Sequence, residues 1–151
     1  MTLLSRKTRY ALDAVVNIAQ HARPNPVQSK DIAERQGIPQ RYLESVMQHL
    51  VRKGILRGVR GPRGGYRLAR ERRRISVGEV IRFVTDLERR EESWPNGSGS
   101  KLGQFSVFPR LQAAEERMLT ELDSITIEDV CRETKDGFGK IAKSGEIDFS
   151  I

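Results

Sequence analysis

The feature that most constrains the fold of this chain is a short glycine- and proline-rich stretch, GPRGG at residues 61–65, set between two apolar runs. Pro62 fixes one turn dihedral, and Gly64 and Gly65 accept the positive φ angles that other residues avoid, so the backbone reverses here. These features predict two antiparallel strands that form a β-hairpin with Arg63 near its tip. The apolar residues of the two strands are Ile55, Leu56 and Val59 before the turn, and Tyr66 and Leu68 after it.

Positive charge is concentrated around this turn. The chain holds 27 Lys and Arg against 20 Asp and Glu, a net charge of +7, but residues 52–74 hold ten basic residues against the acid Glu71, a net charge of +9. The rest of the chain therefore carries a net charge of −2, which is +7 minus +9. A local excess of this kind indicates a polyanionic partner such as nucleic acid. The alternative is a solvated basic face, and the position of the arginines on a hairpin favours the polyanion.

Three helices are predicted before the hairpin. Apolar residues spaced by three and four predict the first over residues 6–22, and the segment RPNP at residues 23–26 ends it. Ser29 is expected to cap a short second helix, which ends at Gly37. Pro39 opens the third helix. The buried stripe of the third helix is expected to contain Leu43, Val46, Met47 and Leu50.

Two helices joined by a short glycine-containing turn and followed by a basic hairpin form a winged helix-turn-helix. The helix pair alone is also common in domains that do not bind DNA. Together with the hairpin, it places one exposed helix face against a DNA major groove and an arginine-tipped ribbon near adjacent phosphates or a minor groove. We therefore expect DNA contacts from the helices at Ser29, Gln40, Arg41, Ser45, Gln48, His49 and Arg52, and from the wing at Arg60, Arg63 and Arg67.

The second half of the chain is predicted to be helical apart from one polar loop. The capping box of Ser76 and Glu79 begins a fourth helix, and a long helix resumes near residue 107. The long helix has a narrow apolar seam, typical of a helix that packs lengthwise on another, either in the core or, as we prefer, across a dimer interface. The seam consists of Val107, Leu111, Ala114, Met118, Leu122 and Ile125.

A short last helix is expected to begin at a cap formed by Thr126 and Asp129 and to end near Thr134. The fold class is thus mainly α with a small β-hairpin. The expected domains are a DNA-binding domain at residues 1–86, a flexible loop at 87–104, a dimerisation helix with a short terminal helix at 105–135, and a tail at 136–151.

Several of these motifs, in this order and spacing, resemble the Rrf-two family of bacterial winged-helix regulators, which includes the IscR, NsrR and CymR types. The matching stretches are KTRYAL, QSKDIAERQGIPQRYLESVMQHLVRKGIL, VRGPRGGYRLAR, ISVGEVIRFV and SITIEDV. The resemblance implies a dimeric transcription factor in which the long helices of two subunits cross. It also implies that the third helix reads bases in the major groove while the wing lies in the minor groove.

Many members of this family hold an iron-sulfur cluster through three cysteines in the loop before the long helix. The corresponding loop here, residues 88–104, has no cysteine, and thiolates are the ligands that such clusters chiefly require. We therefore expect no cofactor and no metal site. Cluster-free members of the CymR type respond to sulfur status through a cysteine-biosynthesis enzyme, so the resemblance implies that sulfur or cysteine metabolism is controlled, with that enzyme or a small-molecule effector as a further partner.

Three other residues leave alternatives open. The chain's one cysteine, Cys131, is expected to be buried and structural, with a redox sensor as the alternative. His21 is expected near the end of a helix, where a cation is favoured. Trp94 lies in the polar loop, where it either closes a ligand pocket or folds back on the core.

Composition excludes other classes of protein. No run of about 18 apolar residues and no secretory signal are found, so we expect a cytoplasmic protein without a membrane partner. No catalytic residues are identified, because no nucleophile lies next to a plausible base and no nucleotide-binding loop is present. The alternatives are a regulator of the same family that senses redox state or nitric oxide, through an iron-sulfur cluster or otherwise, and a protein-interaction module that binds an acidic partner.

Overall fold

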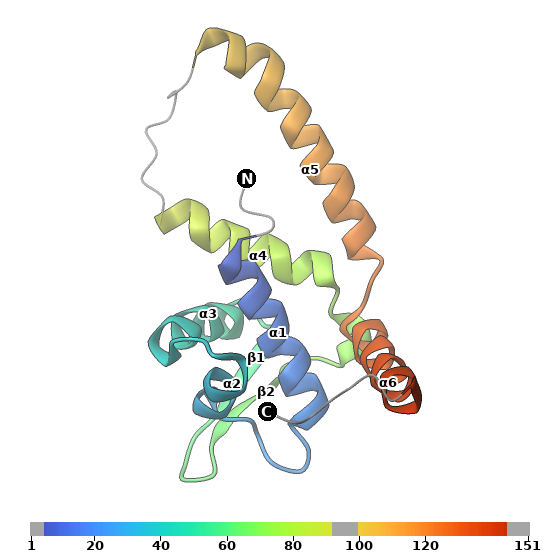
Figure 1. The fold of residues 1–151 in the computed structure, drawn as a ribbon. Helices are drawn as coiled ribbons and strands as arrows, with labels where there is room; N and C mark the ends of the chain where they lie inside the picture. Colours follow the sequence, from blue (N-terminus) through green and yellow to red (C-terminus); the bar gives the residue numbers. More distant parts are fainter. Residues whose placement is uncertain (1–4, 92–99, 145–151) are drawn as a thin grey trace.

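The computed structural model describes residues 5–91 and 100–144, and it consists of helices with one small two-stranded sheet (Figure 1). The predicted fold class, mainly helical with a β-hairpin, is confirmed. The first half contains α1 (Arg6–His21), α2 (Ser29–Gln36), α3 (Gln40–Arg52), β1 (Leu56–Val59), β2 (Gly65–Leu68) and the 3-10 turn η1 (Arg72–Arg74). The second half contains α4 (Val77–Glu91), the π-helical turn η2 (Gly103–Val107), α5 (Phe108–Asp123) and α6 (Ile127–Ser144).

The core lies where α1 packs against α3, α4 and α6. Each helix turns one stripe of aliphatic side chains toward this centre, as the spacing of three and four residues dictates. The expected stripe of α3 and the apolar face of α4 are buried, and the first residues of the sheet close the core from below (Figure 1). Fully buried side chains include Ile18, Leu43, Leu50, Ile55, Ile75 and Ile127.

The predicted capping box at Ser76 and the predicted cap at Thr126 are both formed. The Glu79 backbone N–H donates to Ser76 Oγ over 3.0 Å at the start of α4. At the start of α6, the bonds run in both directions: Thr126 N–H donates to an Asp129 carboxylate oxygen over 2.9 Å, and Asp129 N–H donates to Thr126 Oγ1 over 3.1 Å. These bonds satisfy N–H groups that have no partner within a helix.

The starts of α4 and α6 are also tied to each other by an isolated β-bridge between Ser76 and Thr126. The Val77 N–H donates to the Ile125 carbonyl over 2.8 Å, and the Ile127 N–H donates to the Ile75 carbonyl over 2.9 Å. The chain between residues 76 and 126 therefore begins and ends at the same place.

Two boundaries differ from the prediction. Helix α6 continues to Ser144, whereas we expected it to end near Thr134. The segment beyond Thr134 contains two glycines, each of which costs about 1 kcal/mol in a helix, but Lys135, Lys140, Ala142 and Lys143 around them are good helix formers. The helical backbone before α5 starts at Lys101 instead of near Val107. Trp94 lies outside the described residues.

Candidate nucleic-acid interface

The turn between α2 and α3 sets the direction of α3. Gly37 adopts a left-handed conformation with φ 63°, and the N–H groups of Gly37 and Ile38 both bond to the Ala33 carbonyl. The tight end of α2 lets α3 begin after only three intervening residues, directly after Pro39. With the apolar stripe buried, α3 leaves five of the predicted DNA-contacting side chains exposed. They are Gln40, Arg41, Ser45, Gln48 and Arg52.

Glu44 organises the beginning of this face, a role that the sequence analysis did not assign. Its Oε1 accepts from Ser29 Oγ over 3.2 Å and from Gln40 Nε2 over 3.1 Å. The expectation that Ser29 caps α2 is wrong, because Ser29 is the first helical residue and its hydroxyl bonds to Glu44. An acidic side chain on a face predicted to meet a polyanion is the signal that could have drawn attention to Glu44.

His49 does not belong to the exposed face, which corrects our prediction. Only 5% of its surface is exposed, and its Nε2 donates to the Phe83 carbonyl of α4 over 2.8 Å. His49 lies three residues after Val46 and next to Leu50, so it falls at the edge of the buried stripe, where α4 covers it. Burial is the main reason that its pKa is lowered, with the nearby positive charge of Lys53 as a further cause.

The wing is a regular antiparallel hairpin in which Leu56 pairs with Leu68 and Val59 with Gly65. Gly61 has the positive φ, 113°, that we expected of Gly64. Gly64 is needed for a different reason, because a Cβ there would overlap the Val59 carbonyl oxygen. The two predicted tip residues, Arg60 and Arg63, are exposed.

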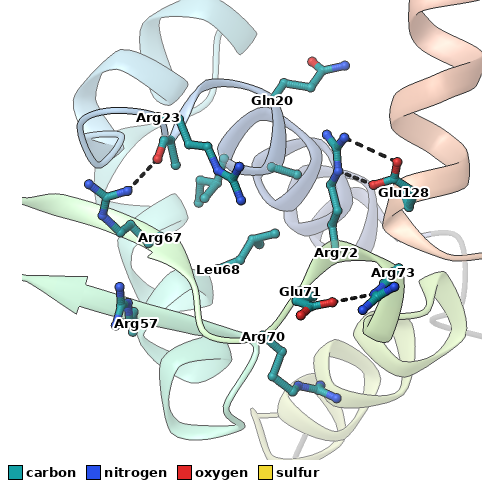
Figure 2. A pocket seen from close by; sticks show the side chains of 13 residues that line it. Gln20, Arg23, Arg57, Arg67, Leu68, Arg70, Glu71, Arg72, Arg73 and Glu128 are labelled. Carbon is teal, nitrogen blue, oxygen red and sulfur yellow. Dashed lines mark hydrogen bonds and ion pairs between the residues drawn. The ribbon is translucent and has the colours of Figure 1, made fainter.

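Arg67, the third predicted wing residue, is turned toward the protein (Figure 2). Its guanidinium donates to the Ala22 carbonyl over 2.6 Å and to the Pro24 carbonyl over 2.5 Å. The end of α1 carries partial negative charge on its free carbonyls, which favours a cation at this position. Arg67 therefore fixes the hairpin to α1 and has fewer donors left for DNA than Arg60 or Arg63.

Two contacts missed by the sequence analysis join the other elements to α3. Tyr66 of β2 lies near Glu44 and Gln48 of α3, and burial is the main reason that the pKa of its phenol is raised. At the start of α1, Lys7 Nζ lies 5.4 Å from the centre of the Tyr42 ring, a cation–π distance. Tyr42 is partly exposed on α3 and packs edge-to-face against Tyr10. The α3 face is thus held by both the wing and α1.

The predicted seam of the long helix divides into two parts. Leu122 and Ile125 pack against the core of the same chain, together with the buried Leu119. Val107, Leu111, Ala114 and Met118 are exposed. The exposed apolar surface also includes three residues that the sequence analysis did not single out, Leu102, Phe105 and Phe108, of which Phe105 is 82% exposed.

The chain does not fit a cluster held by three thiolates, because it contains one cysteine. Cys131 is 1% exposed within α6, and burial raises the pKa of its thiol, which agrees with a structural residue rather than a reactive one. In the described ranges, no group of three or more His, Cys, Asp or Glu side chains is placed to hold a metal ion. None of the helices that the structure describes combines the length and apolar character needed to cross a bilayer.

Comparison with known proteins now identifies the family. The model of the Rrf2 family, described as an iron-dependent transcriptional regulator, matches residues 4–133. The transcriptional regulator IscR of Xenorhabdus nematophila is 36% identical over 132 residues, which cover 85% of this chain and 79% of that protein. IscR of Vibrio cholerae is 46% identical over 83 residues, which are 55% of this chain but only 48% of the length of that protein.

Solved structures agree with these relatives. IscR of T. potens superimposes with a TM-score of 0.68 and 34% identity, covering 89% of each chain. CymR of B. subtilis, described as the global cysteine regulator, superimposes with a TM-score of 0.63 and 27% identity, covering 86% of this chain and 96% of that one. The fold of this chain is therefore shared with these two regulators over most of their length. The chain therefore belongs to the Rrf2 family of transcriptional regulators.

Proposed function

We propose that this protein is a sequence-specific DNA-binding transcriptional repressor that acts as a homodimer in the cytoplasm, without an iron-sulfur cluster and without enzymatic activity. The observation that carries the proposal is the pairing of an exposed polar face on α3 with a wing tip that presents Arg60 and Arg63 to solvent. Arg41, Ser45 and Gln48 supply donors and acceptors of the kind that read base edges in a major groove. The two wing arginines supply charge for phosphates or a narrow minor groove.

The experiment selects a preferred duplex from random sequences and then measures its binding in the presence of excess random DNA. A sequence-specific reader keeps its preference for the selected duplex, whereas a general polycation or a module for acidic proteins does not. Arg63→Ala should weaken binding of the selected duplex about tenfold, because a charge-assisted contact is lost. Arg117→Ala, which removes the same charge from α5, is the matched control. Equal binding of selected and random DNA would contradict the proposal.

The homodimer is supported by the exposed apolar residues of α5 and of the turn before it. Phe105, Phe108 and Leu111 lie on a helix whose first half projects away from the core (Figure 1). Monomeric proteins rarely expose an apolar surface of this kind, and a second copy of α5 would cover it.

Control of sulfur or cysteine metabolism is our proposal for the regulated genes. It is supported by the likeness to CymR of B. subtilis and by the lack of cluster-binding cysteines in this chain. The signal would then come from a cysteine-biosynthesis enzyme or a small-molecule effector. Mapping the bound sites across the genome tests this assignment, and binding upstream of genes unrelated to sulfur would contradict it.

A further inference from the structure

An arginine-rich cavity of about 620 Å³ lies between the end of α1, the outer side of the hairpin, η1 and the first turn of α6 (Figure 2). Its lining contains six arginines and two glutamates, so the lining carries a net charge of +4. Cavities of this size hold small molecules. The arginines are Arg23, Arg57, Arg67, Arg70, Arg72 and Arg73.

Half of these arginines are neutralised by carboxylates of the same chain. Arg72 pairs with Glu128 at the start of α6. Arg73 pairs with Glu71 over 2.5 Å, and Arg70 pairs with Glu79 over 2.6 Å. Because Glu71, Glu79 and Glu128 are already paired with these arginines, they do not neutralise the charge of the other three arginines.

The other three arginines, Arg23, Arg57 and Arg67, are paired with no carboxylate in the described part of the chain. Arg67 bonds only to neutral carbonyl groups, so it keeps its full charge. Arg57 is the direct cross-strand partner of Arg67 in the hairpin. Two like charges at such a position repel each other and destabilise a hairpin. An anion between them would remove this repulsion.

We propose that this cavity binds a small, multiply charged oxyanion, with Arg23, Arg57 and Arg67 as its principal partners. Guanidinium groups bind carboxylates and phosphates through paired, charge-assisted hydrogen bonds, and three of them lining one cavity favour a ligand with at least two negative charges. The same chemistry is offered by a free metabolite and by the phosphates of flanking DNA. We assign the cavity to the free anion because it is lined from several sides by α1, η1 and α6 as well as by the wing.

The cavity opens on a different side of the hairpin from α3. None of the residues that line the cavity belongs to α3. Successive side chains of a strand point to opposite faces, so Tyr66, which lies near Gln48 of α3, points away from Arg67. An anion in the cavity therefore leaves the α3 face free but fixes the hairpin that carries Arg60 and Arg63. This consequence rests on the proposed DNA-binding function: the bound anion should change duplex affinity by holding the wing in one position.

The first experiment uses the full chain without DNA, at constant ionic strength, with pyrophosphate and citrate as probes and chloride as the reference anion. Either probe, at about 100 times its dissociation constant, should raise the unfolding temperature by about 5 °C. Arg57→Ala should weaken binding of the probe at least about tenfold, measured by calorimetry, whereas Arg117→Ala should leave it unchanged. Without the probe, Arg57→Ala should be as stable as the unaltered protein or more stable, because it removes the repulsion with Arg67.

Three results would overturn the proposal. One is that neither probe stabilises the protein more than chloride does, and another is that Arg57→Ala binds the probe as tightly as the unaltered protein does. The third is that Arg57→Ala weakens binding of a selected duplex while no probe binds, which would assign the cavity to the DNA backbone. If a probe binds and no duplex is preferred over random DNA, the anion site stands and the proposed regulator function fails.

Discussion

His49 is a point at which a single side chain connects α3 to the rest of the protein. Its Nε2 donates to the Phe83 carbonyl, so the helix proposed to read DNA is fixed to α4 by a titratable side chain. Burial lowers the pKa of His49 below its ordinary value of about 6.5. In the unfolded chain, where burial is lost, the pKa returns to that value.

The lowered pKa predicts a stability loss in acid. As the pH falls below about 6.5, the unfolded chain takes up a proton before the folded one does, so the contribution of neutral His49 is complete above about pH 6.5 and is lost as the pH falls through its folded pKa. His49→Gln keeps a donor for Phe83 but cannot titrate. Urea unfolding at pH 7.5 and pH 5 should therefore show a smaller decrease in the free energy of unfolding for His49→Gln. An identical decrease in both proteins would exclude His49 as the titrating group.

The residues whose positions differ from prediction have one physical cause in common. The spacing of apolar residues predicts which face of a helix is buried, but it does not predict how far a neighbouring helix covers the margin of that face. His49 lies at the margin of the buried face of α3 and is buried because α4 covers it. Arg67 lies on the expected face of its strand. The carbonyls that accept its hydrogen bonds belong to Ala22 and Pro24, which are 45 and 43 positions earlier in the chain. Local spacing predicted the exposed positions Gln40, Arg41 and Ser45, whereas long-range contacts decided the others.

Among the elements, the wing requires a glycine at position 64, and this requirement is testable. Gly64→Ala should distort the turn, because the added methyl group would overlap the Val59 carbonyl oxygen. Gly58→Ala in β1 is the matched control, since a methyl group there meets no atom within 4 Å. We expect Gly64→Ala to weaken binding of the selected duplex about tenfold or more while the core unfolds at an unchanged temperature. Equal duplex binding by Gly64→Ala and Gly58→Ala would show that the turn geometry is irrelevant to DNA binding.

The contact between α4 and α5 depends on a close approach at Gly78. A Cβ at this position would lie 2.7 Å from the Asp123 backbone nitrogen and would overlap the Asp123 carboxylate. Asp123 also binds Arg82 over 2.9 Å, and Arg82 in turn binds Glu116, so the displaced end of α5 would lose an ion-pair network. The pairs are partly exposed, so the steric overlap is expected to outweigh their loss.

Gly78→Ala should therefore lower the free energy of unfolding by about 1–3 kcal/mol, the usual cost of overpacking. Gly137→Ala in α6 tests the same substitution in a helix where the methyl group meets nothing within 4 Å. The second change should be neutral or should stabilise the protein by up to about 1 kcal/mol. Chemical denaturation of both variants measures the difference, and a destabilised Gly137→Ala together with a neutral Gly78→Ala would contradict the packing described for α4 and α5.

For the molecule as a whole, the sequence was sufficient to predict the order of the α-helices and strands, but not the turns η1 and η2. The winged helix could be predicted because each of its parts has a local signal: the left-handed Gly37, the apolar stripe of α3 and the turn at residues 61–65. The length of α6 could not, because glycines at 137 and 139 suggest an end that the helix does not have. The arginine-rich cavity could not be predicted either, since α1, β2, η1 and α6 meet only in three dimensions.

The proposed homodimer leads to a prediction about the assembled molecule. Leu111→Glu places a charge in the exposed apolar surface of α5 and should convert the protein to a monomer, because burying an unpaired carboxylate is unfavourable. Gln112→Glu adds the same charge at the neighbouring exposed position and should remain a dimer. Light scattering after size-exclusion chromatography measures the mass of each variant. A monomeric unaltered protein, or a dimeric Leu111→Glu, would contradict the assigned interface.

Duplex binding by the proposed dimer should also depend strongly on salt. If each subunit neutralises about three phosphates, the slope of log affinity against log salt concentration should be about −5. The slope is measured by titrating the selected duplex at several salt concentrations. A slope near zero would mean that the basic wing makes no phosphate contacts.

The β-bridge between Ser76 and Thr126 connects the residue before α4 to the residue before α6. The two N–H···O=C bonds, from Val77 to Ile125 and from Ile127 to Ile75, hold the start of α4 and the start of α6 at a fixed position relative to each other. Added or deleted residues between α4 and α5 would alter the length of the connection between these helices without shifting the α3 face or the wing. This segment is therefore where homologous chains can diverge in length, and where a foreign peptide could be inserted, while duplex recognition is retained.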